Sequence, residues 1–167
     1  MPLLKYGKII DDPWVHVDED TALPAVGSII ISLARWLNKS GELGRRQGFL
    51  GIRLNSDQPP STIAGDLDQF AVIALDFPIF ADGRAYSYAR VLCGKYGFKG
   101  EIRAVGNILR DQYQFMRLCG FDAFEVAPET RAEDWDAYGG AIGVYYQPDV
   151  RGQPPVPSLR PGVCKAV

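Results

Sequence analysis

Short apolar runs alternate along the chain with stretches of helical periodicity. Residues 29–33 and 70–75 are continuous apolar runs, which is typical of strands buried on both faces of a sheet. Residues 49–54 predict a strand between these two, and residues 101–105 and 122–126 predict two more strands after them. The pattern therefore predicts about five strands in the central part of the chain.

Two helices are predicted between the later strands. They cover residues 82–96 and 107–119, where apolar residues recur at spacings of three and four. The first residue of each is a candidate N-cap. Each helix is followed by a glycine, Gly97 or Gly120, which favours a left-handed helix end.

Weaker patterns fill the rest of the chain. Residues 62–69 and 129–138 predict short helices, and residues 141–146 predict a last strand at an edge of the sheet. Residues 38–48 are polar and contain glycine, so a loop is expected there.

Strands that alternate with helices at this spacing predict an α/β fold of parallel βαβ units. Five strands are too few for a complete eight-stranded barrel, so a half-barrel and an open sheet both fit. One domain is expected over residues 1–167. Residues 1–20 predict a small antiparallel flap, and the proline-rich residues 147–167 predict a tail that packs on the domain or on a neighbouring subunit, which favours a homodimer.

Composition excludes several classes of protein. The net charge of −2 gives no electrostatic footprint for nucleic acid or for an anionic membrane. No apolar run reaches the roughly 20 residues of a membrane span, and the N-terminal residues break too early for a signal peptide. The three cysteines are far apart, which fits free thiols in a reducing compartment. We therefore expect a cytoplasmic protein.

Ligands of open sheets and half-barrels lie outside the carboxyl ends of the strands. This rule places a set of polar and flexible residues on one rim of the predicted sheet. The set comprises Arg35, Asn55, Asp76, Asp82, Gly83, Arg84, Gly106, Asn107, Ala127 and Pro128.

Two arginines are expected in the first turns of their helices, namely Arg84 and Arg110. A helix N-terminus favours negative charge, so a cation there needs an acidic partner or an anionic ligand. Pairing, for example of Arg84 with Asp82, and an anion site both fit the sequence. Arg103 lies in a strand suited to burial, and it needs either a structural salt bridge or a ligand.

These considerations define a candidate site. The expected catalytic residues are Arg84, Arg103, Asp82 and Asp111, and the expected ligand-binding residues are Arg35, Asp76, Gly83, Gly106, Asn107, Arg110 and Gln112. His16 is the only histidine, and it is interpreted as an ordinary surface or half-buried side chain because the sequence shows no partner for it.

The chain has no C-x-x-C pair, no G-x-G-x-x-G and no P-loop pattern, and no metal-ligand cluster can be recognised. The sequence therefore identifies no cofactor and no metal site.

Three segments resemble a bacterial family of unknown function. They read FPIFADGRAYSYARVL at residues 77–92, GEIRAVGNILRDQ at residues 100–112 and CGFDAFEV at residues 119–126. Members of this family are labelled as oxidoreductases involved in sulfite reduction and are encoded beside assimilatory sulfite reductase. Where the family usually has an aspartate after the valine–glycine pair, this chain has Asn107.

The resemblance implies a role in sulfur assimilation and leaves two hypotheses. In the first, the protein is an accessory component that binds sulfite reductase or its electron donor, through its tail and exposed tyrosines. In the second, it is a small enzyme that acts on an anionic ligand, bearing phosphate, sulfite or carboxylate, at the rim.

Overall fold

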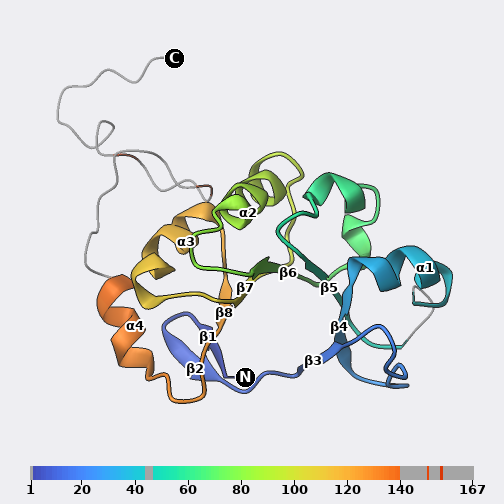
Figure 1. Ribbon diagram of the computed structural model, residues 1–167, viewed down its shortest axis with the longest axis horizontal. Helices are drawn as coiled ribbons and strands as arrows, with labels where there is room; N and C mark the ends of the chain where they lie inside the picture. The colour runs from blue at the N-terminus through green and yellow to red at the C-terminus, as the bar shows by residue number, and fades with distance from the viewer. Residues whose placement is uncertain (1, 44–46, 140–149, 151–154, 156–167) are drawn as a thin grey trace, which may run out of the picture.

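The computed structural model describes residues 2–43, 47–139, 150 and 155 (Figure 1). Within this part of the chain one sheet has eight strands in the order β2-β1-β8-β7-β6-β5-β4-β3. The strands are β1 (Leu3–Lys5), β2 (Lys8–Ile10), β3 (Trp14–Val17), β4 (Ser28–Ser32), β5 (Leu50–Leu54), β6 (Val72–Phe77), β7 (Glu101–Gly106) and β8 (Ala123–Glu125).

The helices lie mostly on one side of this sheet. Figure 1 shows α1, α2 and α3 along one face, with β1, β2 and β3 toward the opposite side. The α-helices are α1 (Leu33–Leu43), α2 (Arg84–Gly94), α3 (Tyr113–Cys119) and α4 (Ala132–Gly139), and the 3₁₀ turns are η1 (Pro60–Ile63), η2 (Leu67–Gln69) and η3 (Arg110–Gln112). None of the described helices is long and apolar enough to cross a membrane.

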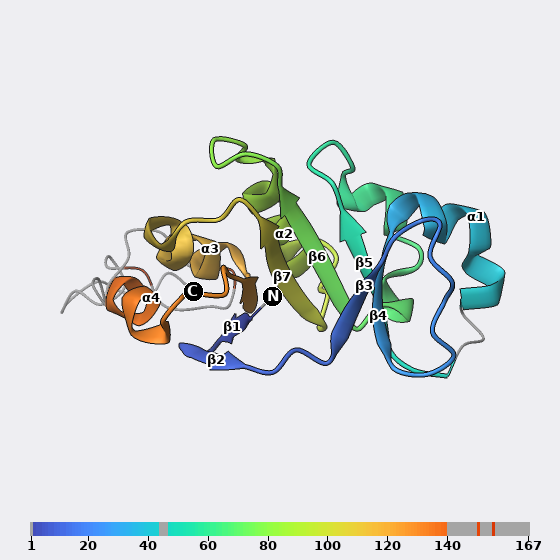
Figure 2. The same cartoon turned by 60° about the horizontal axis from the view of Figure 1, so that its bottom comes forward.

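The sheet is mostly parallel and curls into a half-barrel. Strands β3 to β8 pair in parallel, whereas β1 pairs antiparallel with β8 and β2 pairs antiparallel with β1. The curl brings β3 across to β8, because His16 Nε2 lies 2.7 Å from Glu125 Oε1. Figure 2 shows the chain crossing the open side of the sheet from β2 to β3. The predicted α/β class and the half-barrel alternative are therefore confirmed.

The N-terminal segment is more closely joined to the sheet than the flap prediction implied. Strands β1 and β2 form the expected antiparallel pair, and β1 extends the main sheet by pairing with β8. Residues 14–17, inside the predicted flap, form β3, which pairs in parallel with β4. The sheet thus has six parallel strands rather than about five.

The loop predicted for residues 38–48 is wrong in its first half, because α1 continues to Leu43. Leu33, Trp36 and Leu43 are all buried, and their spacing of three and seven residues places them on one helical face. That buried face outweighs the poor helix propensity of the polar residues between them. Similarly, the single helix predicted at residues 62–69 is two separate 3₁₀ turns, η1 and η2.

The predictions for the ends and the beginnings of the helices had different outcomes. Gly120 ends α3 with a φ of 110°, as expected for a left-handed cap. Asn107 is not an N-cap: its N–H donates to Phe77 O at 2.7 Å, and α3 itself begins at Tyr113. The residue before it, Gly106, has a φ of 92° that turns the chain away from a helical path. The predicted strand at residues 141–146 and most of the tail lie outside the described residues.

Alternate residues of each strand point to opposite faces of the sheet. The face under the helices carries the main core, which includes Ile29, Ile31, Ile52, Ile73 and Phe124. The inner, concave face carries a smaller buried cluster of Ile30, Val72, Ala74 and Val105, against which Trp14 packs. The polar side chains described next share this inner face.

Candidate functional site

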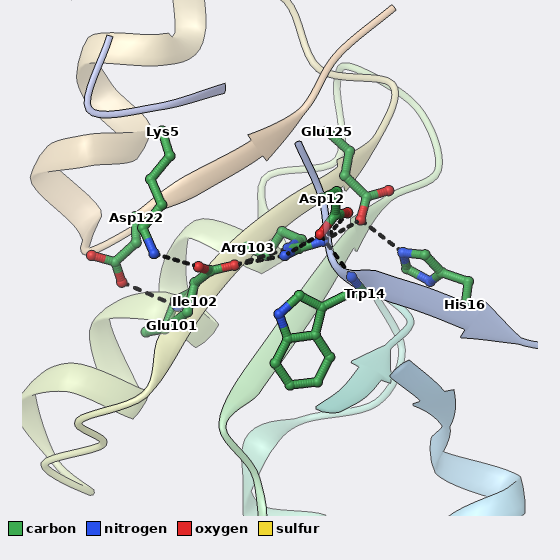
Figure 3. A network of polar contacts seen from close by, with 9 residues as sticks. All are labelled: Lys5, Asp12, Trp14, His16, Glu101, Ile102, Arg103, Asp122 and Glu125. Atoms are coloured by element: carbon green, nitrogen blue, oxygen red, sulfur yellow. Dashed lines mark hydrogen bonds and ion pairs between the residues drawn. The ribbon is translucent and has the colours of Figure 1, made fainter. Parts of the chain in front are cut away.

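Arg103 is the centre of a polar network inside the half-barrel (Figure 3). It lies on β7 between two small residues in register, Ala74 of β6 and Ala123 of β8. Its side chain has no solvent exposure. The small neighbours leave the guanidinium room on the concave face, where acidic side chains surround it.

Three carboxylates neutralise this guanidinium. Asp12 accepts from Nη1 at 2.7 Å and from Nη2 at 3.2 Å. Glu101 Oε1 accepts from Nε at 2.9 Å, and Glu125 Oε1 accepts from Nη1 at 3.1 Å. The salt bridge considered for Arg103 from the sequence is therefore present, with one partner on the neighbouring strand and another on the N-terminal segment.

Two further basic groups flank the carboxylates, as Figure 3 shows. Lys5 Nζ lies 2.7 Å from Glu101 Oε2, and His16 Nε2 lies 2.7 Å from Glu125 Oε1. Burial raises the pKa of Glu125, but the contacts with His16 and Arg103 outweigh it and leave that pKa below its ordinary value. The network therefore joins the segment before β4 to β7 and β8 by charge pairs.

A second ion pair lies nearer the carboxyl ends of the strands on the same face. Arg53 of β5 donates from Nη2 to Asp76 Oδ1 of β6 at 2.6 Å. The Arg53 side chain is 42% exposed, whereas that of Asp76 is 12% exposed. A Cβ on Gly106 would lie only 3.0 Å from Asp76 Oδ1, so the glycine allows the carboxylate its position.

Arg84 stands at the start of α2, on the helix side of the rim. It donates from Nε to Asp82 Oδ1 at 3.0 Å, from Nη2 to Asp82 Oδ2 at 2.6 Å, and from Nη2 to Ser56 Oγ at 2.9 Å. Hydrogen bonds from Arg84 hold the pKa of Asp82 well below its ordinary value. The pairing interpretation of Arg84 is thus present in the structure, and Gly83 is the N-cap residue of α2.

Gln112 joins two loops of the rim. Its Nε2 donates to Phe80 O at 3.1 Å, and its Oε1 accepts from Leu109 N at 3.1 Å. The side chain therefore holds the loop after β6 against the loop after β7, which is a structural role that its sequence position did not indicate.

Arg110 and Asp111 line an open depression beside the carboxyl end of β7, together with Ile108, Leu109 and Trp135. Arg35 lies apart from these residues, in the first turn of α1. It is 6% exposed, and it donates from Nη1 to Asp18 O and from Nη2 to Thr21 O at 2.6 Å. These two hydrogen bonds from Arg35 stabilise the loop before β4.

The predicted site residues thus fall into three places. Asp76, Asp82, Gly83, Arg84, Gly106, Asn107, Arg110, Asp111 and Gln112 lie at or beside the ends of β6 and β7. Arg103 lies within β7 and, among the described residues, shares no acidic partner with Arg84. Arg35 lies in α1, against the loop before β4. Among the residues that the structure describes, no three histidine, cysteine or acidic side chains are grouped as metal ligands would be.

Exposed apolar side chains gather at the same rim. We call this the rim patch, and it consists of Ile79, Phe80, Leu109 and Phe115, with exposed fractions of 59%, 54%, 43% and 55%. The Gln112 bridge holds the Phe80 and Leu109 backbones together. The ring of Tyr86 packs at a tilt against that of Phe115, with ring centroids 5.0 Å apart, so α2 contacts the patch at Phe115.

A comparison with family models gives one match, to a family described as "Bacterial protein of unknown function (DUF934)", over residues 51–157. The chain belongs to this family. The DUF934 match covers more than half of the chain, and the resemblance inferred from three segments is confirmed at the level of the family. A comparison with curated proteins finds no match.

The DUF934 match divides the inner network. It contains Glu101, Arg103 and Glu125, whereas their partners Asp12 and His16 precede it. It also contains the whole rim patch and the Arg53–Asp76 pair. The two features at the rim are therefore built entirely from residues inside the DUF934 match.

Sequence reasoning missed six participants in the ion-pair clusters, namely Lys5, Asp12, His16, Arg53, Glu101 and Glu125. Arg53 had a recognisable signal, because it is a charged residue inside a strand whose neighbours are apolar. Glu125 had the same signal, whereas Asp12 and His16 had none, since Asp12 is 91 positions from Arg103 and His16 is 109 positions from Glu125.

Proposed function

We propose that the protein is an accessory component of assimilatory sulfite reduction, which binds sulfite reductase or its electron donor through the rim patch. The observation that carries the proposal is the rim patch itself, four exposed apolar side chains held together at one end of the sheet. Apolar side chains grouped on a surface mark sites of protein–protein contact.

The position of the rim patch supports this role. Ile79, Phe80 and Leu109 fall within the segments at residues 77–92 and 100–112 that carry the resemblance to the sulfite-reduction family. Gln112 braces the loops that carry them, and the contact between Tyr86 and Phe115 joins α2 to α3 beside them. A braced surface loses little conformational entropy when it binds a partner.

The arginines of the inner network and of α2 also favour an accessory role over catalysis. Arg103 is enclosed by Asp12, Glu101 and Glu125, and Arg84 forms its ion pair with Asp82. Groups that are already paired stabilise the fold and are poorly placed to stabilise charge on a substrate.

A binding measurement with purified components tests the proposal. The full chain is titrated by calorimetry against sulfite reductase and, separately, against its electron donor. Phe80→Ser removes one aromatic anchor of the rim patch, and we expect at least about tenfold weaker binding, equivalent to about 1.4 kcal/mol.

Phe49→Ser is the matched control, because Phe49 is also an exposed phenylalanine, at 68%, and lines a depression elsewhere with Leu43 and Phe70. It should leave the affinity unchanged. The proposal is wrong if the native protein binds neither component, and the rim patch is the wrong surface if both substitutions weaken binding equally.

The depression beside β7 favours a second candidate function, a small enzyme that acts on an anionic ligand at the rim. Arg110 and Asp111, both expected in the site, line that depression, and Arg84 stands 55% exposed at the start of α2. Arg84→Ala should then abolish turnover of a sulfite-, phosphate- or carboxylate-bearing substrate with the fold intact. Arg103→Ala cannot discriminate between the two functions, because it breaks the inner network.

A homodimer and a cytoplasmic location also stay predictions. Light scattering coupled to size exclusion tests the first, since a dimer has twice the 18.4 kDa mass of the chain. Fractionation of cells that express the full chain tests the second.

A further inference from the structure

We infer that the concave face of the sheet has a binding site for a small oxyanion, centred on Arg53 at the carboxyl end of β5. The ligand class is a carboxylate or a tetrahedral oxyanion. The site is distinct from the rim patch and does not depend on the proposed docking function.

The inference starts from a difference in exposure and in partners between two arginines of the inner face, Arg53 and Arg103. Arg53, Ala74 and Arg103 are register partners on β5, β6 and β7, so their side chains share the inner face. Arg103 is fully enclosed and contacts three carboxylates. Arg53 contacts one carboxylate, Asp76, and its side chain is 42% exposed. The hydrogen-bond donors of Arg103 are therefore occupied within the protein, whereas Arg53 keeps donors for another acceptor.

The hydrogen bonds of Arg53 are incomplete. Asp76 takes one bond from Nη2, and Nη1 has no hydrogen-bond partner among the described residues. Nε is shielded from solvent and also has no partner. A shielded donor without an acceptor costs about 1–3 kcal/mol, and folded proteins retain few of them without a reason. Nη1, which is not shielded in this way, can donate to an oxyanion, and a guanidinium with five N–H donors is suited to such a ligand.

Arg35 has the same kind of unpaired Nε, but it is not a comparable candidate. Its two terminal nitrogens are occupied by the carbonyl groups of Asp18 and Thr21, and the residue is 6% exposed. A ligand can approach a guanidinium only where part of it is accessible, which in this pair of arginines applies to Arg53.

The neighbours of Arg53 in the sheet are small residues. Its register partners are Ser32 on β4 and Ala74 on β6, both with short side chains. The site also lies toward the carboxyl ends of parallel strands, where half-barrels and open sheets bind their ligands. Asp76 holds one edge of the guanidinium and so reduces the entropy that Arg53 loses when a ligand binds.

Titration of the full chain with sodium phosphate, sodium sulfate and sodium acetate, at constant ionic strength set by sodium chloride, tests the inference. We follow backbone amide shifts by NMR and expect saturable changes that are largest at residues 53–54 and 76–77. Saturation by phosphate or sulfate alone identifies a tetrahedral ligand, and saturation by acetate alone identifies a carboxylate. An absence of saturation with all three, or largest shifts elsewhere, overturns the inference without reference to any variant.

Variants sharpen the assignment. Arg53→Gln should weaken binding at least about tenfold, and Asp76→Asn should strengthen it several-fold because it removes the competing negative charge. Arg131→Gln is the matched control, since Arg131 is also an arginine with one acidic partner, Glu133 at 3.3 Å, and is 76% exposed. Unchanged affinity in Arg53→Gln, or an equal loss in Arg131→Gln, would show that only general surface charge is being titrated.

Discussion

The inner network makes a quantitative prediction about Arg103. Substitution by methionine keeps much of the side-chain volume and removes the cation that Asp12, Glu101 and Glu125 share. The Arg103 side chain is fully enclosed, and the three carboxylates are 8–13% exposed. Removal of one partner from a buried charge pair costs about 3–5 kcal/mol.

The flanking groups limit the loss. Lys5 still pairs with Glu101 and His16 still pairs with Glu125, which leaves Asp12 without a cationic partner among the described residues. We therefore expect Arg103→Met to lower the free energy of unfolding by about 4 kcal/mol at pH 7, toward the middle of that range. A domain with a total stability of roughly 5–15 kcal/mol then stays folded but becomes marginal.

The loss should depend on pH with a defined sign. The pKa of Glu125 lies below its ordinary value in the folded protein, so its contribution to stability is present above the unfolded pKa of about 4.3 and is lost as the pH falls through the folded pKa. In Arg103→Met the cation that supports this lowered pKa is absent. The stability difference between the native protein and the variant should therefore shrink as the pH falls from about 4.3 through the folded pKa of Glu125.

Urea unfolding monitored by tryptophan fluorescence at pH 7, 4 and 3 measures both effects. Arg131→Met is the control, because that arginine is 76% exposed and an exposed pair contributes about 0–1 kcal/mol. A loss below about 1 kcal/mol at pH 7, or a loss that does not vary with pH, would refute the reasoning about the network.

Three further expectations follow from single contacts. His16→Asn removes the bond to Glu125 and should speed amide hydrogen exchange in β3, whereas an unchanged rate would mean that the strand is held without it. Gly106→Ala should cost at least about 2 kcal/mol by thermal unfolding, because φ is 92° and a Cβ would meet Phe77 O at 2.6 Å. Gly65→Ala, where a Cβ meets nothing within 4 Å, should change stability by less than about 1 kcal/mol, and similar losses in the two would contradict the steric argument.

The fold was largely predictable because its signals are local. The apolar runs at β4 and β6 and the glycine after α3 each depend on residues close together in sequence. One exception, α1, had a buried face of Leu33, Trp36 and Leu43, but its polar intervening residues concealed the periodicity. The polar residues of this segment favour a loop, but the burial of one helical face stabilises the helix more.

The candidate site was predictable only in part, because side-chain partners depend on how far the sheet curls. The need of Arg103 for a counter-charge could be inferred from its position in an apolar strand. Its partner Asp12 could not be inferred, since no pattern in the sequence specifies that the loop before β3 reaches β7. The Arg84–Asp82 pair could be anticipated because the two residues are only two positions apart.

The strand order has a consequence for the timing of folding. Strands β1 and β2 can pair as soon as both are made, and β3 finds its partner β4 about ten residues downstream, but β1 must wait until residues 123–125 have left the ribosome before it can pair with β8. During that interval one edge of β1 lacks its partner strand, and Leu3 and Leu4, both buried in the finished protein, lack their cover, which is the condition that favours aggregation of nascent chains. Such distant pairing also slows folding, so this chain should benefit more than most of its size from a chaperone that shields its first residues during synthesis.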